Sequence, residues 1–211
     1  DLPEDRQPTL RGLALPDEVL QKIKRWVSRP LRTGTAAPGD ALFFRADDGV
    51  HGTELWKTDG TPEGTVLVFD LATIPDLEGN RYPSRLVPFK DELYFAVNGA
   101  ARRSQLWKTD GTPEGTVRLL DLDVGWGFNM IATEDFLYFA GYESSWHSSS
   151  LWKSDGTPEG TMRLRDFGSI QQEIDELIAL QNSVFFVAND GEHGYELWKS
   201  DGTAAGTQLV K

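Results

Sequence analysis

The chain has 211 residues, 39% of them apolar, which is enough for one all-β domain, or two small ones, with a sizeable core. It contains no cysteine, and this excludes disulfides, thiolate metal sites and cysteine nucleophiles. The formal net charge of −12 is uneven, because residues 1–38 hold 7 basic and 5 acidic side chains and leave 14 basic and 28 acidic ones for the remainder. Such a surface repels nucleic acids and anionic lipids and suits cations, neutral sugars or basic proteins.

The first 30 residues are predicted to form a strap and a short amphipathic helix, separate from a domain spanning 31–211. Residues 1–16 have three prolines and no periodicity. From Asp17 to Val27 the apolar residues recur at helical spacing, and Pro16 suits a first helical turn. We expect the apolar stripe to dock on the body of the protein, with a membrane-surface helix as the alternative. No stretch approaches the roughly 18 apolar residues of a membrane span, so we expect no membrane insertion.

One eleven-residue phrase, LWKTDGTPEGT, occurs four times with small changes. The copies begin at Leu55, Leu106, Leu151 and Leu197, and the last one reads LWKSDGTAAGT. Their tryptophans are spaced by 51, 45 and 46 residues. This period is typical of propeller blades or of helical arrays.

The phrase carries turn signals that favour strands over helices. Pro62 supplies the fixed φ of a type I turn, Gly64 takes its fourth position, and Asp59-Gly60 adds a side-chain bond and a residue free to adopt φ > 0. The runs on either side are rich in aromatic and β-branched residues, as in hairpin strands.

Each repeat is predicted to hold four strands. The second strand is apolar on both faces, which indicates a sheet covered on both sides. These strands are Leu42-Phe43-Phe44, Leu93-Tyr94-Phe95, Leu137-Tyr138-Phe139 and Val184-Phe185-Phe186. The predicted first strands are Leu31 to Ala37, Arg85 to Phe89, Asn129 to Thr133 and Glu176 to Leu180. We therefore predict an all-β protein, a four-bladed β-propeller with blades at about 31–71, 84–122, 128–167 and 175–211. A solenoid of hairpins and a fragment of a larger ring are the alternatives.

The phrase from Glu54 to Thr65 resembles the ELWxxDGTxxGT repeat of secreted and cell-surface bacterial proteins, over roughly residues 39–211. The resemblance implies an extracellular repeat protein and little chemistry. The leading Glu recurs only at Glu196, with Gln105 and Ser150 in the other copies. The order of an aromatic strand, a second aromatic-centred strand and an acidic turn is also similar to hemopexin-type four-bladed propellers.

Function is expected where the repeats differ. Two Asp-Gly loops, 47–54 and 189–196, match each other, and closure of a ring would set them side by side. Their oxygen ligands suit Ca²⁺. The alternative is a hairpin whose Asp side chains bond its own backbone, and His51 and His193 lack a visible third ligand for a transition metal. The candidate calcium ligands are Asp47, Asp48, Glu54, Asn189, Asp190 and Glu196.

Aromatic residues gather in the loops of the second and third repeats, where they suit a protein partner or a sugar ring, or fold back over the blade. The candidate binding residues are Trp126, Phe128, Tyr142, Trp146 and His147. A catalytic interpretation has little support, because Ser148–Ser150 beside His147 lack an orienting acid and acid pairs such as Asp47 and Asp48 are common in so acidic a chain. We expect a non-enzymatic binding module for a protein or glycan, with a structural, calcium-stabilised repeat domain as the alternative.

Overall fold

The computed structural model describes residues 41–74, 81–98, 104–122, 129–142, 149–168 and 174–210. The predicted strap, the predicted helix over 17–27 and the predicted strand over 31–37 lie outside the described residues. The described part of the chain is built of β-strands, with one 3-10 turn, η2 (Leu71–Thr73), and no α-helix. None of its helices has the length and apolar character to cross a membrane.

The strands form four antiparallel sheets, and each sheet is made of strands that follow one another in the chain. Sheet one holds β1 (Leu42–Asp47), β2 (Thr53–Thr58) and β3 (Val66–Phe69). Sheet two holds β4 (Tyr82–Phe89), β5 (Glu92–Asn98), β6 (Ser104–Thr109) and β7 (Val117–Leu122). Sheet three holds β8 (Asn129–Ala132), β9 (Leu137–Tyr142), β10 (Ser149–Ser154) and β11 (Met162–Asp166). Sheet four holds β12 (Asp175–Leu180), β13 (Ser183–Asn189), β14 (Tyr195–Ser200) and β15 (Gln208–Leu209).

These sheets correspond to the four repeats, so the predicted hairpins and their order are confirmed. The bounds of β8 and β12 differ from the predicted ones by one residue, and β4 begins at Tyr82, three residues before the predicted start. A β-bulge between Ser84 and Val87, with Arg85 at φ 54°, lets the pairing with β5 continue past Pro83. A bulge adds a residue that breaks the simple alternation of inward and outward side chains, and the sequence pattern alone does not reveal it.

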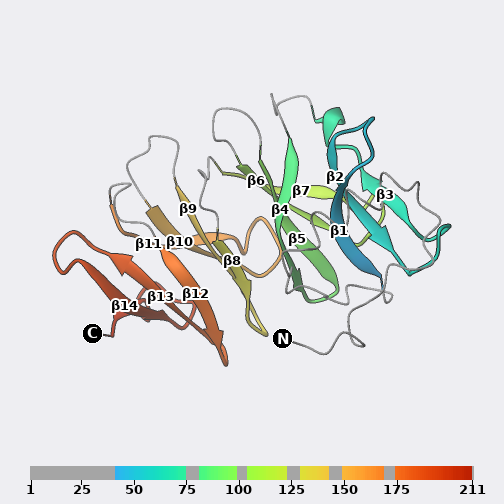
Figure 1. Ribbon diagram of the computed structural model, residues 1–211. Helices are drawn as coiled ribbons and strands as arrows, with labels where there is room; N and C mark the ends of the chain where they lie inside the picture. The colour runs from blue at the N-terminus through green and yellow to red at the C-terminus, as the bar shows by residue number, and fades with distance from the viewer. Residues whose placement is uncertain are drawn as a thin grey trace, which may run out of the picture.

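The four sheets stand face to face in a row, in the order of the chain (Figure 1). Strands β4, β8 and β12, the first of their sheets, contact one another in succession, as the innermost strands of a propeller do. The fold is therefore all-β and β-propeller-like. Sheets one and four lie at opposite ends of the row, and no strand of one is among the principal contacts of the other (Figure 1). The described residues do not show the predicted closure into a four-bladed ring.

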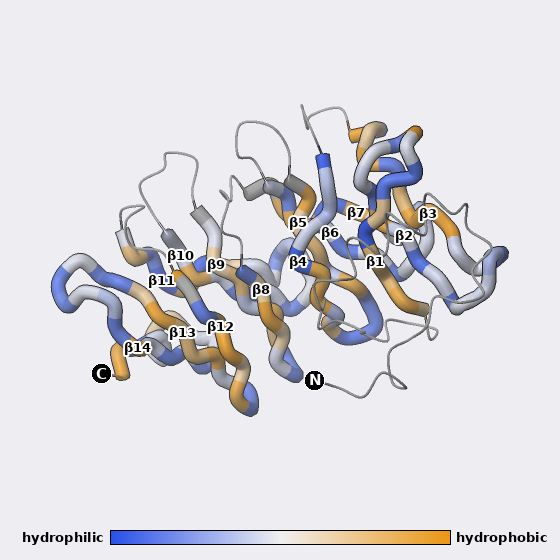
Figure 2. Tube along the Cα trace, viewed as in Figure 1, coloured by the Kyte–Doolittle hydropathy of each residue, from blue (hydrophilic) through white to orange (hydrophobic). Residues whose placement is uncertain are grey.

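Each space between neighbouring sheets is filled by a hydrophobic cluster, so the middle sheets are covered on both faces. We call the side that meets the next sheet along the chain the forward face and the opposite side the rear face. In sheet two, Tyr94 and Leu106 belong to the forward face, whereas Phe95 and Trp107 belong to the rear face. Hydrophobic residues run along many of the strands, whereas most of the turns that join them are hydrophilic (Figure 2). The predicted two-sided burial of the aromatic strands is confirmed in the middle of the row.

The polar residues of the repeated phrase build one turn four times over. In sheet one, Asp59 Oδ1 accepts hydrogen bonds from the backbone N–H of Thr61 at 2.9 Å and from its hydroxyl at 2.7 Å. The Thr61 hydroxyl accepts one from Gly64 N–H, and the Thr65 hydroxyl donates to the Thr61 carbonyl. The other three copies repeat these bonds. The repeated residues therefore specify a turn, and the hydrogen bonds from the hydroxyl and the N–H of Thr61 hold the pKa of Asp59 below its ordinary value.

An aromatic side chain of each preceding sheet presses on the glycine of the next turn. Tyr94, on the forward face of sheet two, approaches Gly156 so closely that a Cβ there would lie 2.4 Å from the tyrosine oxygen. Gly156 also has φ +99°, a backbone conformation that residues with a side chain rarely adopt. The same contact joins Phe43 to Gly111 and Tyr138 to Gly202. These contacts connect the turns with the packing of the row.

Candidate binding surface at the loop end

The two ends of the sheets differ in what they carry. The side chain of Lys90, in the turn between β4 and β5, donates to the Asp155 carbonyl in the repeated turn of sheet three at 2.8 Å. Asn182 in the β12–β13 turn likewise donates to Asp135 in the β8–β9 turn. The repeated turns and the first-to-second turns therefore share one end, which we call the turn end. The described second-to-third loops, β1–β2 and β13–β14, leave their sheets at the opposite end, which we call the loop end (Figure 1).

The β1–β2 loop is an Asp-Gly loop that bonds mainly to itself. Asp47 Oδ1 accepts from Gly49 N–H at 2.7 Å, and Asp48 Oδ1 accepts from the N–H groups of Val50 and His51 at 2.8 and 2.9 Å. The second oxygen of Asp48 lies 2.7 Å from His51 Nδ1. This is the self-bonded hairpin that the sequence offered as the alternative to a calcium site.

The β13–β14 loop has the same geometry three sheets away. Asn189 Oδ1 accepts from Gly191 N–H at 2.8 Å, Asp190 Oδ1 accepts from the N–H of Glu192 and of His193, and Asp190 Oδ2 lies 2.9 Å from His193 Nδ1. The shared sequence DGxHG thus specifies a shared local structure, because every bond in it spans two or three residues.

Each loop presents an ion pair at its surface. Partial desolvation would raise the pKa of Asp48, but the hydrogen bonds from His51 outweigh it and bring the pKa to about 2. The hydrogen bond to Asp48 in turn raises the pKa of His51 above its ordinary value, and Asp190 raises that of His193 in the same way. Both histidines therefore carry more positive charge near neutral pH than free imidazoles do.

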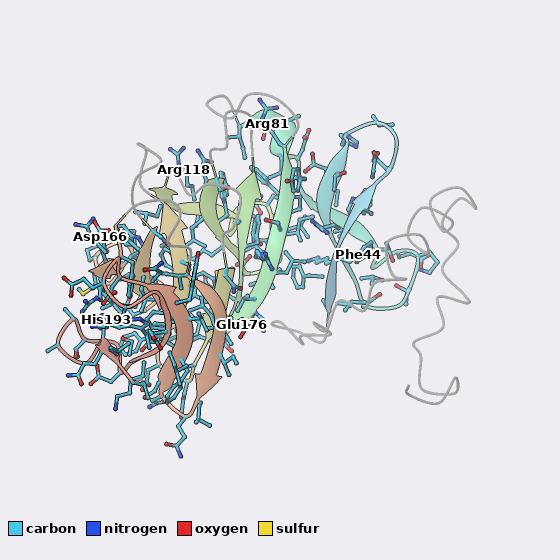
Figure 3. All side chains as sticks on the ribbon, turned by 60° about the vertical axis from the view of Figure 1, so that its left-hand side comes forward. Phe44, Arg81, Arg118, Asp166, Glu176 and His193 are labelled. Atoms are coloured by element: carbon cyan, nitrogen blue, oxygen red, sulfur yellow. The ribbon has the colours of Figure 1, made fainter. Side chains whose placement is uncertain are left out.

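The structure does not bring the two loops together. The β1–β2 loop and the β13–β14 loop lie at opposite ends of the row (Figure 1), and His193 at the tip of sheet four is far from Phe44 in sheet one (Figure 3). No group of three or more His, Asp or Glu side chains within the described ranges is placed to hold a metal ion. The combined calcium site depended on ring closure, which the described residues lack. Calcium binding stays a prediction, which melting with and without a chelator checks.

Glu54, one of the proposed calcium ligands, is a buried carboxyl at the base of the first loop. It is 2% exposed, and one of its oxygens accepts from Leu71 N–H at 3.0 Å. Burial raises its pKa to about 7, although the Leu71 bond opposes the shift. Its place in the repeat is taken by Gln105 in sheet two, whose amide oxygen accepts from Trp107 Nε1 at 3.0 Å. The sequence showed only that this position varies, and the burial of its charge needed the sheet packing.

Most of the predicted aromatic surface lies outside the described residues, namely Trp126, Phe128, Trp146 and His147. Tyr142 is the last residue of β9, where its backbone pairs with Ser149 at the loop end. The remaining candidate, Glu196, sits in β14 opposite Ala188 at the base of the second Asp-Gly loop. All the described candidates thus belong to the loop end, as the repeat alignment indicated.

A scan against protein-family models finds no match, and neither does a search of the curated proteins. Among solved structures, the chain is similar to a puromycin hydrolase mutant complexed with PGG, with a TM-score of 0.58, 13% identity and coverage of 81% of this chain and 28% of that one. It is also similar to a prolyl endopeptidase, with a TM-score of 0.50, 11% identity and coverage of 81% and 24%. An exo-beta-1,3-galactanase from Phanerochaete chrysosporium with beta-1,3-galactotriose has a TM-score of 0.46 and 9% identity over 82% and 48%.

The chain thus spans less than a third of the first two proteins. At these identities the likeness concerns the fold alone. In both of these proteins the similar row of sheets is part of a longer chain.

Proposed function

We propose that the protein is a non-enzymatic, extracellular repeat scaffold that binds a protein or a glycan through the loop end of its sheets. The observation that carries the proposal is the division between the two ends. The turn end uses the repeated residues for the same hydrogen bonds in every sheet. The segments that differ between repeats begin where β5 and β9 end, at the loop end.

The contacts of the turn end leave it little freedom to evolve a binding site. Its carboxylates accept internal hydrogen bonds, and in three of the four turns a glycine lies against an aromatic residue of the preceding sheet. Sequence changes there would disturb packing, whereas changes in the loops leave the sheets intact. Loop aromatics between small residues, as in the segment 142–150, supply flat apolar surface for a partner.

Charge narrows the class of partner. The net charge of −12 opposes nucleic acids and anionic membranes and favours basic or neutral surfaces. A glycan without charge and a protein with a basic patch both satisfy this condition. The likeness of the repeated phrase to secreted and cell-surface bacterial proteins supports a location outside the cell.

The described histidines do not form a Ser-His or Thr-His catalytic pair. His51 and His193 each pair with an Asp of their own loop, and among the described residues no serine or threonine hydroxyl bonds to either ring. A nucleophile activated by a base needs such a bond.

A glycan array and a pull-down with surface-protein fractions test the proposal. We expect a ligand in one of the two assays. Trp146→Ala should weaken its binding at least ~10-fold, because an aromatic anchor carries a large share of interface energy. Ser144→Ala, in the same loop, is the matched control and should bind as the parent does. Absence of any ligand in both assays, or a ligand unaffected by both Trp146→Ala and Trp126→Ala, would contradict the loop-end assignment.

A further inference from the structure

The forward face of sheet four is exposed at positions that every other sheet buries. Leu197 has 41% of its surface exposed, whereas the three leucines at the same place in the repeat, Leu55, Leu106 and Leu151, are fully buried. Val210 is 45% exposed, and its counterpart in sheet three, Leu164, is buried. Ile178 and Leu180 of β12 lie on the same face and are exposed as well. Sheet four therefore carries, on its forward face, the apolar residues that the other sheets bury against a neighbour.

The three interfaces inside the row show what such a neighbour looks like. Each consists of a forward face whose aromatic residue presses on the turn glycine of the following sheet, as Tyr94 does on Gly156. Phe185 holds this aromatic place in sheet four, since it pairs with Lys199 as Tyr94 pairs with Lys108. Phe185 has no following turn within the described chain.

Sheet one presents the other half of the same contact. Gly60 adopts φ +93°, and its three counterparts also have positive φ, but a Cβ at Gly60 would meet nothing within 4 Å. Leu42, on the rear face beside it, is 39% exposed, although Leu93, Leu137 and Val184 at the same place are fully buried. Farther along this face, Ala46 and Glu54 are buried. The open part of the rear face is therefore its turn end.

Charge is also complementary between the two open faces. The Asp of each inner turn lies near a lysine of the preceding sheet, with Lys57 near Asp110, Lys90 near Asp155 and Lys153 near Asp201. Lys57 in addition donates to the Gly111 carbonyl at 2.6 Å. For Asp59 no lysine among the described residues does the same. Lys199, on the forward face of sheet four, holds the place of Lys57 and Lys153 and is exposed.

We propose that the forward face of sheet four docks on the rear face of sheet one of a second copy of the chain, so that Phe185 meets Gly60 and Lys199 meets Asp59. The two faces are halves of an interface that the row already contains three times. They lie at opposite ends of one chain (Figure 1), and a second copy brings them together without bending the row. Contact between different faces of two copies is head-to-tail, and it either closes into a ring or extends as a chain.

The test is the oligomeric state of the 211-residue chain, measured by light scattering and analytical ultracentrifugation over a range of concentrations. We expect the mean mass to rise with concentration. Ile178→Glu disables the forward face of sheet four, and Leu42→Glu disables the rear face of sheet one. Each places an unpaired carboxylate in the interface and should weaken association on the order of 100-fold. Val50→Glu, a change of the same kind at an exposed loop residue on neither face, is the matched control.

Mixing the two disabled variants distinguishes head-to-tail docking from other arrangements. Each variant should be monomeric alone, and an equal mixture should form a dimer and nothing larger, because one intact pair of faces remains. Lys199→Glu is a second forward-face variant should Ile178→Glu reduce the melting temperature. The proposal is overturned if the parent protein is monomeric at every concentration. That result is expected if the row closes on itself or if the forward face of sheet four needs a further repeat. A Leu42→Glu protein that still dimerises would also overturn the proposal. No external ligand is used, so the outcome is independent of the binding tests at the loop end.

Discussion

The repeated turns and the Asp-Gly loops have similar local chemistry but different surroundings. In both, an Asp side chain accepts bonds from residues two or three positions later, and a glycine adopts positive φ. Gly156 in a turn lies against Tyr94, whereas a Cβ added at Gly194 in a loop would meet nothing within 4 Å. Equal hydrogen bonding therefore does not mean equal constraint. A neighbouring sheet constrains the turns of sheets two, three and four, whereas the Asp-Gly loops are held by local bonds.

The largest expected effect comes from adding a methyl group at two turn glycines that differ in their neighbours. Gly156→Ala should destabilise the protein by about 3 kcal/mol, because both the positive φ and the contact with Tyr94 oppose it. Gly60→Ala has a similar φ and no close neighbour, and should cost about 1 kcal/mol. Denaturation by urea at low protein concentration measures both. Equal losses would show that the interface between sheets adds no constraint.

Removing an aspartate should also affect stability differently in a repeated turn and in an Asp-Gly loop. Asp110→Ala removes the acceptor of two hydrogen bonds from Thr112 and should destabilise the fold by about 2 kcal/mol. Asp190→Ala removes comparable bonds from an exposed loop, and its effect should be clearly smaller, because the loop can open without unfolding the sheets. Urea denaturation of the two variants provides the measurement. A larger loss from Asp190→Ala would reverse the assignment of the two ends.

The pH dependence of stability should show whether Glu54, at the base of the first Asp-Gly loop, is buried in the folded protein. Below pH 4.5 the carboxyl is protonated in both states, and between pH 4.5 and 7 the unfolded chain releases a proton that the folded protein keeps. Stability should therefore fall as the pH rises through this window and stay level above it. Glu54→Gln removes this loss and should stabilise the protein by about 2 kcal/mol at pH 8, with little effect at pH 4.

Gln105→Glu is the matched reverse change in sheet two, at a buried position with the same register. It should introduce a similar decline of stability with pH. Melting curves from pH 4 to pH 8 follow both variants. If the stability of the parent protein is level over this range, folding does not raise the pKa of Glu54, and the prediction is wrong.

The smallest effect is expected from the loop histidines. The bond to Asp48 raises the pKa of His51, so the folded state gains a charged pair that is complete below pH 6.5 and is lost as the pH rises through the raised pKa. NMR titration should give His51 a pKa above 6.5, and Asp48→Asn should return it toward that value. The melting temperature should change little, because the pair is exposed and screened.

Short-range features were predictable from the sequence because their causes lie within a few residues. The repeated turn, the order of the hairpins and the self-bonded Asp-Gly loops each depend on bonds spanning at most four residues. Two-sided burial of Leu93–Phe95 followed from the absence of alternation. The bulge at Arg85 did not, because a positive φ at an arginine leaves no pattern in the sequence.

The relation between distant repeats required the structure. Closure of the row was inferred from the number of repeats, but the geometry of packing between sheets decides whether the first and last repeats meet. The loops that carry Asp48 and Asp190 lie at opposite ends of the row, and calcium binding by them stays a prediction. The same separation leaves Leu197 and Leu42 exposed, although the residues at the same positions of the other repeats are buried.

By itself the sequence determined an all-β chain of four equivalent hairpin sheets, each with a turn specified by Asp, Gly and Thr, and it assigned the variable segments to one end. The tertiary structure alone decided which copies of a residue are buried, where Glu54 loses contact with water, and which faces are left without a neighbour. The physical reason is that a turn is set by bonds within one segment, whereas burial is set by surfaces that only meet once the sheets have packed.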